Sequence, residues 1–345
     1  MTATPITTRL TERLGLKSPI ICAPMGSAAT GELAAIVSAG GGFGTIGAVY
    51  NTSAQVKTRI QAARTQLQLP PGSPVPIGVG LIGWVLDMTD KDGAEDPRLP
   101  AILEEMPTAI WLSFGELGKY VDRIREHDAK SGRKTFIFLQ TGAVADAVKY
   151  AAMGDADTVV GNESGGHGRA DAPPLSTLLQ AVFSALPAPR PLIVAAGGIT
   201  TGAQIAALLT HGADGVVLGT RFLFSHESGY TPAAKQALLE ATTDVNATVR
   251  TMAYDEVGRT TGWPAEYDGR AIRNRVMEDL EEGLDIEERL ALFDAAKEKG
   301  ETDRLVAWAG MGVGAIDKLE PAADILKNLH EETVQALRAA RSLVA

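Results

Sequence analysis

The chain has 345 residues, 45% of them hydrophobic, and a formal net charge of −10 at pH 7. This charge disfavours nucleic acid as a partner, because the phosphate backbone would be repelled. The single cysteine, Cys22, excludes an internal disulfide and a cysteine-based zinc site, and we predict no metal centre. No signal-peptide core and no apolar run of roughly 20 residues is present, so we expect a cytoplasmic protein without membrane association.

Short apolar segments alternate with longer amphipathic ones along most of the chain. The predicted strands are Ile20–Ala23, Phe43–Ile46, Ile77–Leu81, Ala109–Ser113, Thr135–Leu139, Thr158–Val160, Leu192–Ala196 and Gly215–Leu218. The clearest predicted helices are Thr30–Ala39, Ser53–Leu67, Leu117–Lys130, Ala143–Met153, Pro174–Ala185 and Thr201–His211. Several strands are apolar throughout, which is typical of parallel strands that are covered on both faces.

Local signals mark the ends of these elements. Thr30, Ser53 and Thr201 are predicted N-caps, and Gly212 is a predicted C-cap. The acidic, proline-containing stretch Gly83–Pro100 predicts a long loop between a strand and a helix. Repeated strand–helix units favour a closed (β/α)8 TIM barrel, and a doubly wound open sheet is the alternative.

The pattern changes after the eighth strand. We predict that residues 1–228 form the barrel and that residues 229–345 form a helical extension packed on it. Helices are predicted over Thr231–Ala241, Ala271–Lys299 and Ala322–Leu343. Residues 309–314 are too rich in glycine for a helix interior. The charged helices of the extension would also suit a homodimer.

The active site of a TIM barrel lies at the C-terminal ends of its strands, so the residues that follow each strand are candidates. After the first strand, Ala23, Pro24 and Met25 lead into Gly26, and this turn can lie along a flat ring. A tight strand exit without a ligand is the alternative. After the fifth strand, Gln140 can donate and accept hydrogen bonds at the polar edge of a cofactor, or it is a rim residue without a role.

A glycine-rich loop is predicted over residues 161–169, after the sixth strand. Glycines such as Gly166 let the backbone approach a ligand, while the imidazole of His167 can act as a base or an acid near neutrality. We therefore predict that His167 is catalytic; a solvent-exposed loop histidine is the alternative. Glu163 either orients His167 or is a surface charge, and His226, after the eighth strand, is a weaker second candidate.

Glycines also follow the last two strands of the predicted barrel. Gly197 and Gly198 come after the seventh strand, and Gly219 and Thr220 come after the eighth. Backbone amides in these two loops make the recurrent phosphate site of the fold. FMN, with one phosphate and one large flat ring, fits a site that joins these loops to the barrel mouth.

At these residues the chain resembles the nitronate monooxygenase family, also called 2-nitropropane dioxygenases. The matching segments are Ala23-Pro24-Met25, Ala39–Gly42, Gly161–Gly168, Ala196–Ile199 and Gly215–Phe222, and Ala309–Gly314 resembles a late glycine-rich segment of the family. The resemblance implies FMN as cofactor, O2 as co-substrate and a small nitro compound as substrate. It implies the oxidation of alkyl nitronates or nitroalkanes to carbonyl compounds and nitrite.

The resemblance also assigns roles to the candidate residues. His167 would be the catalytic base or the group that orients the nitro or nitronate oxygens. The isoalloxazine ring would be flanked by Ala23, Pro24, Met25 and Gln140. The phosphate would be held by Gly197, Gly198, Gly219 and Thr220.

The chain departs from the family pattern at Gly80, Val160 and Met311, where many members carry amide or polar side chains. An Ala-Gly-Met arrangement is also similar to FMN barrels that reduce quinones or enoyl thioesters with NAD(P)H, and those relatives share the histidine loop. An NAD(P)H-dependent FMN reductase is therefore the alternative function. A barrel that binds a phosphorylated ligand without redox activity is the alternative of another class.

Overall fold

The computed structural model describes residues 4–90, 95–244 and 246–343. Within these ranges eight parallel strands form one sheet, in the order β1–β9–β8–β6–β5–β4–β3–β2. They are β1 (Ile20–Cys22), β2 (Thr45–Gly47), β3 (Val75–Ile82), β4 (Pro107–Ser113), β5 (Phe136–Thr141), β6 (Ala156–Val160), β8 (Leu192–Ala196) and β9 (Gly215–Leu218). A parallel bridge between Ile21 and Phe43 closes the sheet. The prediction of a (β/α)8 TIM barrel is confirmed.

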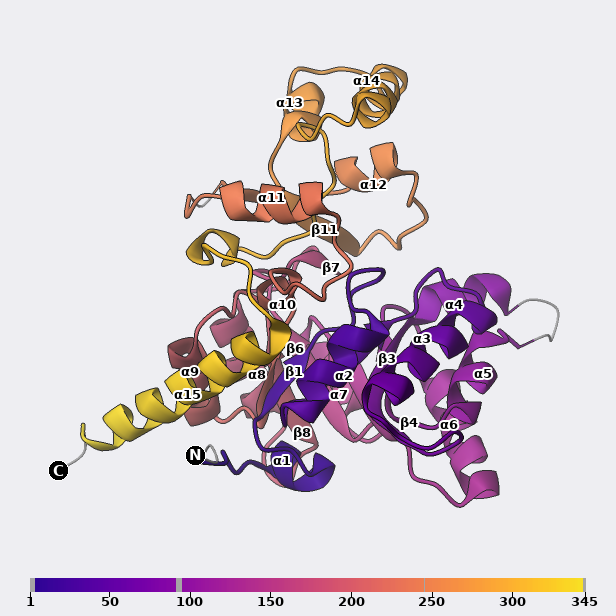
Figure 1. Cartoon of the computed structure of the whole chain (residues 1–345), viewed down its shortest axis with the longest axis vertical. Coiled ribbons are helices and arrows are strands. Elements are labelled where there is room, and N and C mark those ends of the chain that lie inside the picture. Colours follow the sequence, from indigo (N-terminus) through magenta and orange to yellow (C-terminus); the bar gives the residue numbers. More distant parts are fainter. Residues whose placement is uncertain (1–3, 91–94, 245, 344–345) are drawn as a thin grey trace.

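Helices surround the barrel and cover the outer faces of its strands (Figure 1). They are α2 (Gly31–Ala39), α3 (Ser53–Gln66), α4 (Gly83–Thr89), α5 (Arg98–Glu104), α6 (Gly118–Ser131), α7 (Val144–Tyr150), α8 (Leu175–Ala185) and α9 (Gly202–His211). At the two ends of the barrel lie α1 (Arg9–Leu14), whose Leu10 packs in the interior cluster, and the short α10 (Thr220–Leu223) at the mouth. The structure includes no helix, among the residues it describes, that is both long and apolar enough to cross a membrane.

Capping side chains explain where several of these helices begin and end. The hydroxyl groups of Thr30 and Thr201 accept hydrogen bonds from backbone amides of α2 and α9, as predicted. Gly212 ends α9 with a φ of 114°, a conformation that favours glycine. The predicted N-cap Ser53 is wrong, because Thr52 holds that position and forms a capping box with Gln55.

The segment that follows β3 is more regular than its composition indicates. The predicted loop Gly83–Pro100 contains α4 and the first residues of α5, and its residues 91–94 lie outside the described residues. Trp84, Val85 and Leu86 are buried on α4. Burial of these apolar side chains overrides the local proline and acidic signals on which the loop prediction depended.

Large side chains fill the interior of the barrel. Ile21, Trp111, Phe138, Val194 and Val217 belong to one buried cluster there. The rings of Trp111 and Phe138 are stacked, with their centroids 5.3 Å apart. Two further clusters lie between the strands and the helices. Both faces of the strands are therefore covered, which explains their continuous apolar sequences.

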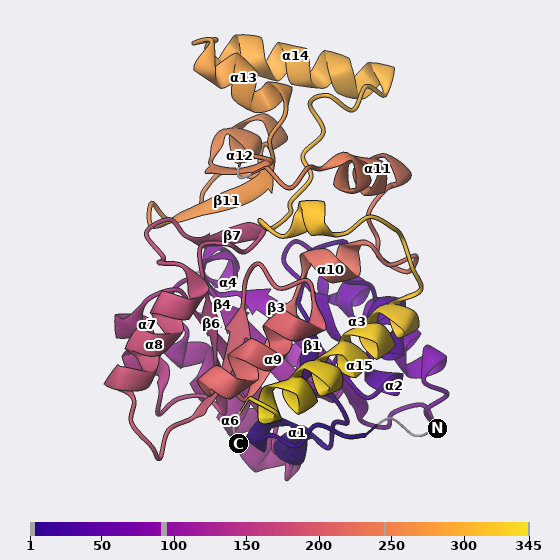
Figure 2. The ribbon, with the colours of Figure 1, turned by 90° about the vertical axis from the view of Figure 1, so that its left-hand side faces the viewer.

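The chain after α10 forms a smaller layer above the mouth of the barrel (Figure 2). It contains α11 (Pro232–Glu240), β10 (Thr248–Thr251), α12 (Ala253–Gly258), β11 (Tyr267–Ile272), α13 (Arg275–Glu281), α14 (Ile286–Lys299) and the 3-10 turn Val313–Ala315. The last helix, α15 (Ala322–Arg341), returns to the barrel and lies against α9, where Glu332 accepts a hydrogen bond from the amide of Gly202.

Two predictions for this part of the chain are corrected. The predicted helix over 271–299 is divided, because β11 continues to Ile272 and Gly283, with a φ of 84°, separates α13 from α14. The predicted loop over 161–169 contains the strand β7 (Gly166–Arg169), which pairs antiparallel with β11. β10, β11 and β7 make a three-stranded sheet, and a strand that requires a distant partner leaves little local signal.

Candidate active site

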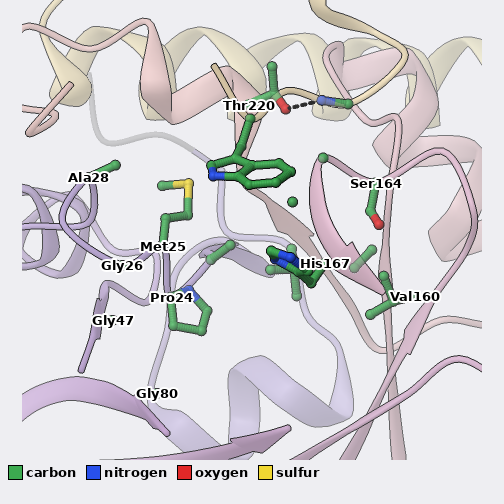
Figure 3. A pocket seen from close by; sticks show the side chains of 18 of the residues that line it. Pro24, Met25, Gly26, Ala28, Gly47, Gly80, Val160, Ser164, His167 and Thr220 are labelled. Atoms are coloured by element: carbon green, nitrogen blue, oxygen red, sulfur yellow. Dashed lines mark hydrogen bonds between the residues drawn. The ribbon is translucent and has the colours of Figure 1, made fainter. Parts of the chain in front are cut away.

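One cavity of about 370 Å³ opens at the C-terminal ends of the barrel strands, below the three-stranded sheet. Its volume is within the range of sites for small molecules and cofactors. The residues assigned to catalysis and cofactor binding from the sequence all line this cavity: Ala23, Pro24, Met25, Gln140, Gly166, His167, Gly197, Gly198, Gly219 and Thr220. Figure 3 shows Pro24 and Met25 on one side of the cavity, and His167, Ser164 and Val160 on the opposite side.

The wall beneath Pro24 is built from residues that lack side chains. A Cβ atom on Gly80 would lie 2.4 Å from the Cβ atom of Pro24, so the proline ring occupies the space that a side chain at residue 80 would need. On the outer side, the Arg59 guanidinium donates hydrogen bonds to the carbonyl oxygens of Gly47, at 2.6 Å, and Gly26, at 3.1 Å. Arg59 thus ties the loops after β1 and β2 together.

Gln140 is held in one orientation by the barrel interior. Its Oε1 atom accepts a hydrogen bond from the indole Nε1 of Trp111 over 3.2 Å. Among the described residues no acceptor takes a hydrogen bond from its NH2 group, which can therefore donate to a ligand. This is the arrangement expected of a side chain that donates to the polar edge of a cofactor.

The loops after β8 and β9 offer several polar groups to an anion. Gly197 and Gly198 have φ angles of 117° and 70°, which let the backbone turn toward the cavity. Thr220 Oγ1 accepts a hydrogen bond from the Gly310 amide over 2.8 Å, a contact drawn in Figure 3. Its hydroxyl hydrogen has no acceptor among the residues that the structure describes. Ser164 Oγ is buried without a hydrogen-bond partner among the described residues, and a polar ligand in the cavity would satisfy it.

His167 is positioned by a buried carboxylate. Its Nε2 atom lies 3.0 Å from both Oδ1 and Oδ2 of Asp255, whose side chain is fully buried. Thr260 donates a second hydrogen bond to Asp255 Oδ1 over 2.7 Å. A carboxylate only accepts, so Nε2 carries the hydrogen in this contact and the lone pair resides on Nδ1.

Aromatic rings enclose the imidazole. The His167 and Trp263 rings are stacked, with centroids 3.7 Å apart and an interplanar angle of 5°. The centroid of the Trp308 ring lies 4.8 Å from that of the imidazole. The backbone carbonyl oxygen of Trp308 accepts a hydrogen bond from the Tyr230 hydroxyl over 2.9 Å. Gly269 makes room for the indole, because a Cβ atom there would lie 2.4 Å from Trp308. The side chain of His167 is only 13% exposed as a result.

Two other sequence candidates have different surroundings from those expected. Glu163 neither orients His167 nor is a free surface charge, because both of its carboxylate oxygens accept hydrogen bonds from the Leu175 amide, at 3.1 and 2.9 Å, and so cap α8. His226 is exposed and does not line the cavity. Met311, one of the departures from the family pattern, is 41% exposed, whereas its neighbours Gly310 and Gly312 line the cavity.

Sequence reasoning missed Asp255, Trp263 and Thr260. All three belong to the layer above the barrel, where the strand-end rule does not apply. Asp255 lies in a short acidic helix that reads as a solvated surface. The glycine before Trp263 is the sequence feature that could have indicated a turn at this place. Gly262 has a φ of 101°, a conformation that favours glycine and marks a tight turn.

Comparisons with known proteins agree with this geometry. A family model described as nitronate monooxygenase matches residues 90–332. The chain is 34% identical to a nitronate monooxygenase of Neurospora crassa, over 95% of this chain and 93% of that protein. Its structure is similar to that of a nitroalkane oxidase from Streptomyces ansochromogenes, with a TM-score of 0.74, 26% identity and coverage of 96% and 99%. It is also similar to FabK from Thermotoga maritima, with a TM-score of 0.77, 25% identity and coverage of 98% and 100%.

The family model covers well over half of the chain, and the sequence relative extends over nearly all of it. The residues that the family model matches include strands β4, β5, β6, β8 and β9 and the cavity-lining residues Gln140, His167 and Gly219. The chain therefore belongs to the nitronate monooxygenase family and is an oxidoreductase.

Proposed function

We propose that this protein oxidises alkyl nitronates and nitroalkanes with O2, using bound FMN, and releases carbonyl compounds and nitrite. The observation that carries the proposal is the pair of His167 and Asp255 at the edge of the cavity. This pair supplies a base with a fixed tautomer beside a space that suits a flat cofactor. Family membership supports the reaction class.

The residues around the cavity fit FMN. The phosphate would be held by Gly197, Gly198, Gly219 and Thr220, which offer backbone amides and one hydroxyl at the ends of β8 and β9. The isoalloxazine would lie against Ala23, Pro24 and Met25, with Gln140 at its polar edge. Gly166, which lines the cavity, has a φ of 68°, and a Cβ atom there would meet nothing within 4 Å. The backbone of Gly166 therefore lies directly beside space that a cofactor could fill. When bound, FMN supplies a two-electron acceptor that O2 reoxidises.

His167 handles the proton of the reaction. The α-carbon of a nitroalkane is acidic, and the Nδ1 lone pair of His167 accepts its proton in the step that forms the nitronate. The buried Asp255 carboxylate stabilises the imidazolium that results, because it accepts the Nε2 hydrogen over 3.0 Å. With a nitronate as substrate, the proton is already lost. His167 then takes a proton on Nδ1 from solvent, donates it in a hydrogen bond to a nitronate oxygen and so orients the substrate.

The rings around His167 keep water away from this step. Trp263 covers one face of the imidazole, and Trp308 lies against it at 50°. Hydrogen bonds to a charged oxygen are stronger in such a water-poor site than in bulk water. The approach to His167 is therefore restricted to the cavity.

A second candidate function is an NAD(P)H-dependent FMN reductase of quinones or enoyl thioesters. The observation that favours it is Ala309-Gly310-Met311, which resembles the corresponding segment of such reductases. Gly310 lines the cavity, so this segment contributes to the site. Family membership as an oxidoreductase leaves the non-redox binding barrel without support.

Two measurements separate these functions. The purified protein is expected to show a flavin absorbance spectrum, and a colourless preparation that FMN cannot reconstitute would exclude both functions. Oxygen uptake is then compared with propyl-2-nitronate and with NADH plus a quinone. We expect oxygen uptake with nitrite release on the nitronate. Rapid NADH oxidation without a response to nitronates would favour the reductase instead.

A further inference from the structure

One flat face of the His167 imidazole is covered by an indole. The ring centroids of His167 and Trp263 lie 3.7 Å apart, and the two ring planes differ by only 5°. This contact places the π face of the indole directly against the imidazole. The hydrogen bond to Asp255 lies in the plane of the imidazole instead, because Nε2 carries its hydrogen in that plane. Trp263 and Asp255 therefore act on the same ring from two different directions.

Trp263 is held in this orientation by other aromatic rings. Its ring meets those of Trp84 and Phe114 edge to face, and the centroids lie 5.2 Å apart in both pairs. The three side chains belong to one apolar cluster. Gly262, with a φ of 101°, turns the chain immediately before the indole. A rotation of Trp263 would break these contacts, so the stack on His167 is fixed by the surrounding packing.

The surroundings of the stack are poor in water, and the neighbouring cation is paired. The His167 side chain is only 13% exposed, and the centroid of the Trp308 ring lies 4.8 Å from that of the imidazole. Arg169 shares the face of β7 that carries His167, because side chains two positions apart on a strand point the same way. Arg169 Nε donates to Asp171 Oδ1 over 2.9 Å. The charge of Arg169 is therefore neutralised by its own partner and does not oppose a positive charge on His167.

The face of an aromatic ring attracts a cation. Its π electrons give the face a partial negative charge, and the attraction acts on cations within about 6 Å of the ring centroid. Among the aromatic side chains the indole of tryptophan attracts cations most strongly, and the attraction increases where water is excluded. The Trp263 ring therefore stabilises the imidazolium, which is the form in which His167 holds a substrate proton.

We propose that Trp263 is a positioning residue of the reaction, because its indole face stabilises the imidazolium that forms when His167 holds a proton on Nδ1. This inference rests on the proposed function above, and Trp263 acts through His167 rather than on the reacting atoms. With a nitroalkane, the imidazolium forms during proton transfer, so the contribution of Trp263 belongs to kcat. With a nitronate, the imidazolium is present when the substrate binds, so the contribution belongs to KM.

Two substitutions test this division between kcat and KM. Trp263→Phe keeps a flat face with a weaker attraction for cations, and Trp263→Leu fills space without a π face. In the FMN-loaded enzyme we expect Trp263→Leu to lower kcat for a nitroalkane and to raise KM for the corresponding nitronate, each by about 10-fold, with Trp263→Phe in between. Trp84→Leu is the matched control, since Trp84 packs on Trp263 and is not among the residues that line the cavity. Equal changes in Trp84→Leu and Trp263→Leu would overturn the inference, because packing alone would then explain them.

Fluorination separates the charge of the indole face from its shape. A tryptophan that carries three fluorine atoms on its benzene ring, incorporated only at Trp263, keeps the stacked ring but loses negative charge from its face. We expect kcat for the nitroalkane to fall by about 5-fold or more. The same replacement at Trp84 is expected to leave kcat unchanged, since that ring does not stack on His167. An unchanged kcat after fluorination at Trp263 would overturn the inference.

Chemical modification makes the test independent of turnover. Diethyl pyrocarbonate acylates the lone pair of a neutral imidazole and does not react with an imidazolium. At about pH 6.5 we expect His167 to be modified about 3-fold faster or more in the protein fluorinated at Trp263 than in the natural protein. Mass spectrometry of the peptides measures the rate, with the exposed His226 as the internal reference. Equal rates would overturn the inference. If neither a nitroalkane nor a nitronate is oxidised, the proposed function fails, and the modification rates still decide the role of Trp263.

Discussion

His167 Nε2 lies 3.0 Å from both carboxylate oxygens of Asp255, although 88 positions separate the two residues. The contact joins β7 to α12, and both elements belong to the layer above the barrel rather than to the barrel itself. The candidate active site is therefore completed by residues beyond the strand ends. Asp255 acts through His167, so we regard it as a positioning residue.

Asp255→Asn is expected to lower turnover of a nitroalkane by about 100-fold or more, because an amide can donate to Nε2 and favour the tautomer without a lone pair on Nδ1. The loss on the corresponding nitronate should be smaller, since no proton has to be removed. Steady-state oxygen uptake on both substrates gives this ratio. Glu163→Gln is the control, because Glu163 caps α8 and does not contact His167. An equal loss on both substrates in Asp255→Asn would indicate a purely structural role.

His167→Asn is expected to retain FMN while lowering turnover by roughly 100-fold or more, because it removes the base but keeps a polar side chain. Flavin content after gel filtration and oxygen uptake are the two measurements. His226→Asn serves as the control, since His226 is exposed and outside the cavity. Undiminished turnover of the preferred substrate by His167→Asn would refute the catalytic assignment.

Gly80→Ala is expected to weaken FMN binding, because its Cβ atom would lie 2.4 Å from Pro24 Cβ and displace the proline ring. Overpacking of this kind costs about 1–3 kcal/mol of stability. Gly118→Ala is the matched control, since its Cβ atom would meet only Met153 Cε, at 3.9 Å. FMN titration and urea unfolding of both variants distinguish the two effects. Normal FMN affinity in Gly80→Ala would contradict the proposed ring position.

Asp157 predicts a pH dependence of stability. Its side chain is fully buried on β6, neither carboxylate oxygen has a hydrogen-bond partner among the described residues, and burial raises its pKa to about 7. The folded protein holds this proton longer than the unfolded chain does. The contribution of Asp157 to stability is therefore present at low pH, and it is lost as the pH rises from about 4 to about 7.

Asp157→Asn removes this dependence. We expect the stability of the variant relative to the natural protein to be greater at pH 8 than at pH 5 by about 3 kcal/mol, since about two pH units lie between pH 5 and the pKa of about 7 and each corresponds to about 1.4 kcal/mol. Urea unfolding at the two pH values measures the difference. Asp122→Asn, on an exposed position of α6, controls for the loss of a charge. The same stability difference at both pH values would show that Asp157 is not protonated in the folded protein.

Much of the barrel could be predicted from local sequence. The apolar segments that became β3, β4 and β8 are continuous because both faces of the sheet are covered, and that burial is visible in composition alone. Parallel strands also end at one edge of a barrel, so the order of the elements brings Pro24, Gln140 and Gly197 to one cavity. The roles assigned to these residues remain predictions.

Only the tertiary structure decided what surrounds His167. Periodicity reports whether one face of a segment is buried, but it does not report which distant segment covers that face. The pairing of β7 with β11 and the contact of His167 with Asp255 depend on the path of a chain that leaves the barrel and returns above it. Local sequence thus determined the barrel and the loops at its mouth, whereas long-range packing determined the tautomer and the aromatic surroundings of the histidine.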